Sequence, residues 1–130
     1  MAANGLVTVE ANRILDDSIS TSGDHTTGST LDLVTTMGTA SAAPTKVTGG
    51  SYAAQTPTWN SASSASKTND GAVTFSGLPA ATIKGVDLKN TSGGDRRWFG
   101  PFASDITTAS GDSITFADAT GLEFSLTNGT

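Results

Sequence analysis

Residues 80–102 constrain the fold more than any other stretch, because they read as a β-hairpin with an aromatic second arm. The polar corner at residues 90–95 contains asparagine, serine and two glycines, which supply the backbone geometries that a chain reversal needs. The returning arm carries Trp98, Phe99 and Phe102. On the outgoing arm the apolar alternation slips by one residue near Gly85, a pattern that predicts a β-bulge. We therefore predict an all-β domain with this hairpin at its middle.

Short segments of alternating apolar and polar residues recur along the rest of the chain, with turn residues between them. The segments expected to form strands are residues 30–36, 45–48, 53–59, 72–76, 113–116 and 122–126. Pro57 favours an edge position for its strand, because proline donates no ladder hydrogen bond. Residues 60–68 are expected to form a serine-rich loop that ends in a turn at residues 69–71. This spacing predicts a single β-sandwich, jelly-roll-like, of about seven to eight strands.

A short amphipathic helix is predicted near the N-terminus. Thr8 suits a helix N-cap, and Glu10 stands in the first turn, where the helix dipole favours a carboxylate. The apolar stripe of this helix consists of Ala11, Ile14, Leu15 and Ile19. We therefore divide the chain into an N-terminal arm and short helix at residues 1–20 and a β-sandwich domain at residues 21–130. Either the helix covers one end of the β-core, or the arm and helix dock on a neighbouring subunit.

Charge and cysteine content exclude several classes of partner and site. The 130-residue chain has a net charge of −5, which argues against binding nucleic acid or an anionic membrane, since both require a basic face. It has no cysteine, so disulfides, thiolate zinc sites and cysteine nucleophiles are excluded. No apolar run reaches the ~18 residues of a membrane span, and no signal segment opens the chain, so synthesis in a cytoplasm is expected.

No catalytic constellation is recognisable among the ionisable residues. The single histidine, His25, lies beside Asp24 in a polar stretch, where an exposed loop histidine is favoured over a hydrolytic triad. A calcium site could use the carboxylates of Asp16, Asp17 and Asp24, but these match no calcium-binding loop pattern. A glycosidase could use Asp112, Asp118 and Glu123, but these fall in turns or on an outer strand face. We therefore expect no enzymatic activity, no cofactor and no metal.

No single motif in the chain identifies a protein family, but six segments taken together can be compared with one. They are LVTVEANRIL (residues 6–15), KVTGGSYAAQ (46–55), TNDGAVTF (68–75), GVDL (85–88), WFGPF (98–102) and SGDSITF (110–116). In order and spacing, over nearly the whole chain, they resemble a family of small tailed-bacteriophage virion proteins, described as capsid decoration or tail-fibre-like proteins. The chain departs from the family pattern at Lys46, where an acidic residue is common, and at Ala54, where arginine is common. If that acid–base pair joins subunits in relatives, the contact is absent here.

The resemblance implies a non-enzymatic structural protein of the phage particle with a β-sandwich fold. The leading expectation is a capsid decoration protein that binds the outside of the head shell and stabilises it. The alternative is a tail or tail-tip component that adheres to glycans or host surfaces. The chain would then reside in the virion, assembled in the host cytoplasm, and would contact neither nucleic acid nor membrane.

Partners expected for such a protein are the major capsid protein or neighbouring virion subunits, in a homo-oligomer such as a trimer or in a multi-copy assembly. Arginine and tryptophan are enriched where protein interfaces carry most of their binding energy, and the N-terminal arm is a second region suited to contacts. The candidate interface residues are Leu6, Val7, Val9, Arg13, Tyr52, Trp59, Arg96, Arg97 and Trp98.

Overall fold

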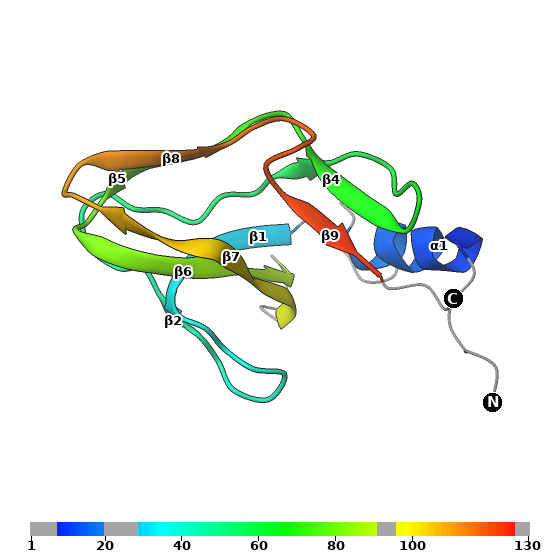
Figure 1. The fold of residues 1–130 in the computed structure, drawn as a ribbon, viewed down its shortest axis with the longest axis horizontal. Helices are drawn as coiled ribbons and strands as arrows, with labels where there is room; N and C mark the ends of the chain where they lie inside the picture. The colour runs from blue at the N-terminus through cyan, green and yellow to red at the C-terminus, as the bar shows by residue number, and fades with distance from the viewer. Residues whose placement is uncertain (1–7, 20–28, 91–95, 127–130) are drawn as a thin grey trace.

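The fold is all-β and sandwich-like, with one short helix (Figure 1). The structure is a computed structural model that describes residues 8–19, 29–90 and 96–126. One layer is a four-stranded sheet in the order β2 (Thr45–Lys46), β1 (Ser29–Thr36), β6 (Ala81–Asn90) and β7 (Arg96–Thr108). The other layer combines β3 (Thr58–Trp59), β4 (Ser66–Asp70) and β9 (Glu123–Ser125) with the pair β5 (Val73–Leu78) and β8 (Asp112–Phe116). All these pairings are antiparallel.

The strand count over the described residues is nine, slightly above the seven to eight predicted. Two of the nine, β2 and β3, have only two residues each, and β3 follows Pro57 at the edge of its sheet, as predicted. The core lies between the layers because alternate residues of each strand point inward. Its largest fully buried side chain is Phe75, which stacks on Tyr52 at a centroid distance of 5.9 Å and meets Phe116 edge-on at 6.1 Å.

The predicted central hairpin forms between β6 and β7, while its polar corner at residues 91–95 lies outside the described residues. The register shifts beside Gly85, where the sequence predicted a bulge. Ile83 pairs with Ile106 and Gly85 pairs with Pro101, so an advance of two residues on β6 corresponds to five on β7. The extra residues therefore belong to β7 and not to the outgoing arm. The slip in the apolar pattern of β6 located the irregularity but not the strand that bulges.

The sequence-based assignment of residues 60–71 was partly wrong. The segment predicted as the end of a serine-rich loop and a turn forms β4, which pairs with β3 on one side and β9 on the other. Its inward residues are polar: Lys67 and Asn69 are both buried. A strand whose core-facing positions are a lysine and an asparagine lacks the apolar alternation by which strands are recognised.

The helix α1 (Thr8–Ser18) covers one end of the β-body beside β4 and β9 (Figure 1). Its apolar stripe is buried as predicted at Ala11, Leu15 and Ile19, and Ile14 is half-buried. The side chains of Thr8 and Glu10 lie outside the described residues, so the predicted N-cap stays a prediction. None of the helical segments described, with α1 at 11 residues, has the length and apolar character that crossing a bilayer requires.

Candidate functional site

Three of the described carboxylates accept hydrogen bonds that hold turns or neighbouring strands. Asp118 accepts a hydrogen bond from the Gly71 backbone N–H at 2.8 Å, and Asp112 accepts one from the Ala109 N–H at 2.7 Å. Glu123 accepts a hydrogen bond from the Ser66 hydroxyl. Among the residues that the structure describes, no three His, Cys, Asp or Glu side chains lie close enough to hold a metal ion. His25 and Asp24 lie outside those residues.

Helix α1 is attached to the β-body by polar contacts as well as by its apolar stripe. Asp16 Oδ1 accepts hydrogen bonds from Lys67 Nζ and from the Ala62 N–H, both at 2.7 Å, and Asn12 Oδ1 accepts one from the Ala65 N–H at 2.7 Å. Burial acts to raise the pKa of Asp16, but the hydrogen bonds from Lys67 and Ala62 outweigh it, so the pKa is lowered. The face of α1 that carries these groups is therefore committed to its own chain.

A network of charges surrounds two buried carboxylates on neighbouring strands. Asp32 of β1 stands directly opposite Asp87 of β6. Asp32 Oδ2 lies 2.7 Å from Lys46 Nζ and 3.7 Å from Lys89 Nζ. The hydrogen bond with Asp32 raises the pKa of Lys46, whereas the proximity of the Lys46 ammonium lowers that of Lys89. Lys46, a position where the resembled family is commonly acidic, thus has a partner within its own chain.

The phenol of Tyr52 belongs to the same network. It donates to Asp32 Oδ1 at 3.2 Å and accepts from the Leu33 backbone N–H at 2.9 Å. Burial raises the pKa of Tyr52 far above its usual value, and the negative charge of Asp32 adds to this, against the opposing effect of the Leu33 hydrogen bond. Tyr52, predicted as an interface residue, is therefore placed with its ring on the core and its hydroxyl on β1.

Arg96, at the start of β7, fastens the loop between β1 and β2 to the sheet. Its guanidinium contacts Asp87 Oδ1 through Nε at 2.9 Å and through one terminal nitrogen at 2.6 Å. The other terminal nitrogen donates to the carbonyl oxygens of Thr39 and Ala42 at 2.7 and 3.0 Å. The group also lies over the Phe99 ring, 5.3 Å from its centroid. The Arg96 charge is thus used inside the chain.

Neither of the two tryptophans, both predicted as interface residues, is fully buried. Trp59 and Trp98 are both half-buried, and both meet the ring of Phe124 edge-on, at centroid distances of 5.4 and 5.9 Å. Arg97, which precedes Trp98 on β7, is half-buried. The two tryptophans, which are distant in sequence, are therefore brought to the same aromatic cluster at the β9 end of the molecule.

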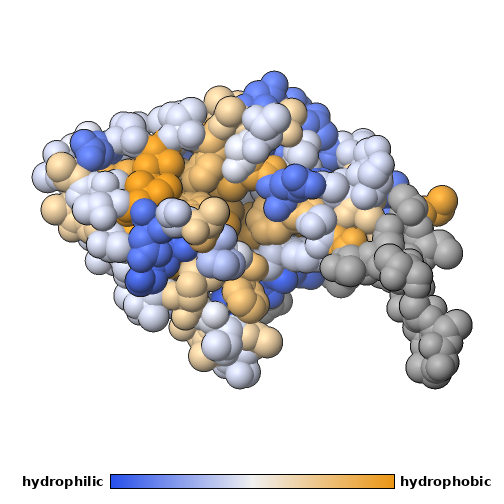
Figure 2. Space-filling model, viewed as in Figure 1, coloured by the Kyte–Doolittle hydropathy of each residue, from blue (hydrophilic) through white to orange (hydrophobic). Residues whose placement is uncertain are grey.

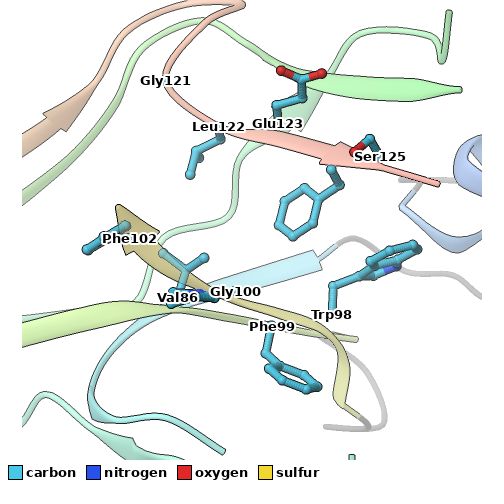
Figure 3. Close-up of a pocket in the computed structure, with 11 residues that line it drawn as sticks. Val86, Trp98, Phe99, Gly100, Phe102, Gly121, Leu122, Glu123 and Ser125 are labelled. Carbon is cyan, nitrogen blue, oxygen red and sulfur yellow. The ribbon is translucent and has the colours of Figure 1, made fainter. Parts of the chain in front are cut away.

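A hollow lined by both apolar and polar groups opens between β7 and β9 (Figure 3). Trp98, Gly100 and Phe102 alternate along β7 and line the hollow together with Val86, which pairs with Gly100. Leu122 and Phe124 line the opposite side, and Glu123 and Ser125 lie at the rim. The hollow has a volume of about 290 Å³. On the face shown in Figure 2, apolar side chains surround a depression in the middle of the molecule, with hydrophilic ones around them.

Gly100 accounts for this hollow. Two aromatic side chains stand two residues before and two residues after it on the same face of β7, and glycine leaves the space between them empty. A Cβ placed on Gly100 would meet no atom within 4 Å, and the backbone there does not have the positive φ that favours glycine. Nothing in the fold itself therefore excludes a side chain at this position.

The opposite wall is held by a buried amide that sequence reasoning assigned to a turn. Asn69, fully buried on β4, donates to the carbonyl oxygens of Gly71 and Ala117 at 2.8 and 2.9 Å. Its side-chain oxygen accepts from the Leu122 N–H at 3.1 Å. Both donors and the acceptor of the amide are used, which fixes the turn that delivers Leu122 to the hollow.

The predicted interface residues of the N-terminal region fall into two groups. Leu6 and Val7 lie outside the described residues. Val9 and Arg13 are exposed on α1, and Val9, at 79% exposure, is one of two large hydrophobic side chains that the described part of the chain leaves exposed. The other is Phe99, at 44%, which points to the side of β7 away from Leu122 (Figure 3).

Sequence reasoning named Trp98 but missed the other residues that line the hollow. The signal that could have found them is the spacing aromatic, glycine, aromatic at positions 98, 100 and 102, because alternate residues of a strand share a face. Comparison of the chain with protein-family models, with curated proteins and with solved structures returns no match.

Proposed function

We propose that this chain is a structural protein of a tailed-bacteriophage particle, a capsid decoration protein that binds the outside of the head shell in many copies and stabilises it. In this role it acts through contacts with the major capsid protein and with neighbouring copies, in a homo-oligomer such as a trimer. It catalyses no reaction, and it works within the virion without binding nucleic acid or membrane.

The observation that carries the proposal is the fit between the resembling segments and the elements of the fold. The all-β, sandwich-like body is the architecture that the resemblance implies. The segment at residues 98–102 lies on β7, that at 85–88 on β6, and that at 110–116 contains β8. Four of the described carboxylates, Asp16, Asp87, Asp112 and Asp118, hold turns, the helix or the sheet, which suits a protein that works by contact. Repeated weak contacts on a symmetric shell reinforce each other, since each raises the effective concentration of the next.

Copy number and location on the particle test this proposal. Quantitative mass spectrometry of purified virions of the phage that encodes the chain should give on the order of hundreds of copies per particle, as many-site binding to a shell requires. Imaging of the same virions should place the extra density on the outside of the head. A handful of copies, or density on the tail alone, would contradict the decoration role.

The second candidate is a tail or tail-tip component that adheres to glycans or host surfaces. The observation that favours it is the hollow lined by Trp98 and Phe102 with a carboxylate, Glu123, at its rim. Aromatic faces with nearby polar groups can hold a sugar ring. A glycan-array or host-cell binding assay should then show binding that Trp98→Ala abolishes and Trp59→Ala does not, because Trp59 does not line the hollow.

A further inference from the structure

The hollow around Gly100 lies between two sheet edges. In the described chain, β7 is the last strand of the four-stranded sheet and β9 is the last strand of its own sheet. Unpaired strand edges with apolar side chains beside them are surfaces that recruit another polypeptide. At about 290 Å³ the hollow is larger than the ~150 Å³ apolar cavity that accepts benzene, so it has room for apolar side chains of a partner.

The chain itself contains an apolar segment suited to this hollow. Four segments lie outside the described residues. In three of them, residues 20–28, 91–95 and 127–130, glycine is the only apolar residue. Residues 1–7, MAANGLV, are uncharged in their side chains and end in Leu6 and Val7. Val9 continues this apolar stretch onto α1, where it is 79% exposed. An uncharged segment can approach the Glu123 rim without repulsion between like charges.

The position of α1 points to a second copy, and not the same chain, as the source of a segment that fills the hollow. Asn12 and Asp16 fix α1 to its own body through Ala65, Ala62 and Lys67. In that position Val9 is exposed and does not line the hollow. Figure 1 shows α1 at one end of the molecule, with the N-terminal end of the helix on the side away from the β-body. The segment that precedes Thr8 is therefore attached at the end of the helix that lies away from the β-body.

We infer that Leu6 and Val7 of one copy occupy the Gly100 hollow of the next copy, with Val9 packed at its rim. Segment and hollow lie on different parts of the chain, so the contact is heterologous and joins copies into rings or chains. The inference deepens the proposed function, on which it rests for the presence of many copies at high local concentration. It assigns the N-terminal segment to copy–copy contact and gives Gly100 a reason to lack a side chain.

Cross-linking between single-cysteine variants tests the contact, because the natural chain has no cysteine. Leu6→Cys and Gly100→Cys proteins are purified separately, mixed and oxidised, so that any disulfide between the two sites joins different chains. We expect the mixture to form the mixed dimer at least tenfold faster than a mixture of Leu6→Cys with Ser113→Cys, whose cysteine is exposed on β8. Equal rates for the two mixtures would overturn the inference.

Filling the hollow provides the second test. Gly100→Leu places a side chain where a Cβ meets nothing within 4 Å, so the melting temperature should be equal to or above that of the natural protein. Its self-association, measured by sedimentation over a range of concentrations, should weaken at least tenfold. The Leu6→Ser, Val7→Ser double variant should show the same loss, and Gly100→Ala, which adds one methyl group, a smaller one.

Self-association of Gly100→Leu equal to that of the natural protein would refute the contact, as would a natural protein that stays monomeric at all concentrations. Binding of each variant to capsid shells is measured in parallel. A variant that no longer self-associates but still binds shells would show that shell binding does not depend on the copy–copy contact. The failure of one proposal can therefore be told apart from the failure of the other.

Discussion

A single carboxylate of α1, Asp16, decides how firmly the helix is held. Lys67 is only 5% exposed in its side chain, and its ammonium depends on Asp16 at 2.7 Å. A buried ammonium that loses its carboxylate lowers the stability of the folded protein, because the charge is then neither solvated nor paired. An apolar side chain of similar length in the same place has no such cost. Lys67 is thus a strand residue whose charge is tolerated only because a helix distant in sequence supplies the counter-charge.

Asp16→Ala should therefore lower the free energy of unfolding by about 1–2 kcal/mol, a range reduced because the carboxylate is itself half-exposed. Lys67→Met should change stability little, and the Asp16→Ala, Lys67→Met double variant should recover most of the loss. Urea denaturation of the four proteins measures the cycle. Additive effects of the two changes would show that the pair is not coupled.

The same carboxylate predicts a dependence on pH. Its pKa in the folded protein lies below the ordinary value of 3.8, so its contribution is fully present above that value and is lost as the pH falls through the folded-state pKa. Between about pH 5 and about pH 2, the melting temperature of Asp16→Asn should fall less steeply than that of the natural protein. Parallel curves would contradict the assignment.

At the scale of elements, the sequence predicted the strands whose inward residues are apolar. Leu122 and Phe124 alternate cleanly with polar residues, as do Val73 and Phe75, and each pair lies on a strand or at its start. The strand β4 was missed because its inward positions, Lys67 and Asn69, become acceptable only through partners on α1 and at residues 117–122. Such partners are fixed by tertiary structure and leave no local pattern.

The candidate site was predicted less completely than the fold. Trp98 was recognised from its residue type, but the hollow depends on the absence of a side chain at Gly100 between two aromatics. The missing side chain at Gly100 creates a hollow only because Leu122 and Phe124 face it from another part of the chain. That proximity is not visible in the sequence. The same limit applies to Arg96, which was predicted as a surface residue and contacts a carboxylate that is 1% exposed.

Arg96 ties three elements together, which gives a prediction at this scale. Arg96→Ala leaves the buried Asp87 carboxylate without its cation and should cost about 3–5 kcal/mol. It should also speed hydrogen exchange of the loop between β1 and β2, whose carbonyl groups at Thr39 and Ala42 lose their donor. Hydrogen-exchange mass spectrometry and urea denaturation measure the two effects.

Lys84→Ala is the matched control on the same hairpin. It removes an ion pair with Asp105 at 2.8 Å in which both side chains are about half-exposed. Exposed pairs contribute about 0–1 kcal/mol, so stability and loop exchange should hardly change. Equal effects of the two substitutions would show that Arg96 does not have the role assigned to it.

At the scale of the whole molecule, the described chain has a well-connected interior and two separate apolar surfaces that it does not cover itself. The helix, the β1–β2 loop and the 117–121 turn are each held by buried or half-buried polar groups. The Gly100 hollow and the segment that includes Val9 are not filled or covered by the described chain. Two separate apolar surfaces on one body suit the proposed role in a multi-copy assembly.

The buried phenol has a practical consequence for measuring this body. Tyr52 is the only tyrosine, and its pKa is raised in the folded protein, so it keeps its proton until the fold is lost. The stability it contributes is fully present below the ordinary phenol pKa of about 10 and declines as the pH rises beyond it. In an alkaline titration the phenolate absorbance should therefore rise together with the loss of β-sheet circular dichroism, and a separate earlier rise would contradict the burial. The chain thus contains an intrinsic optical reporter of its own unfolding, which can be followed without any attached dye.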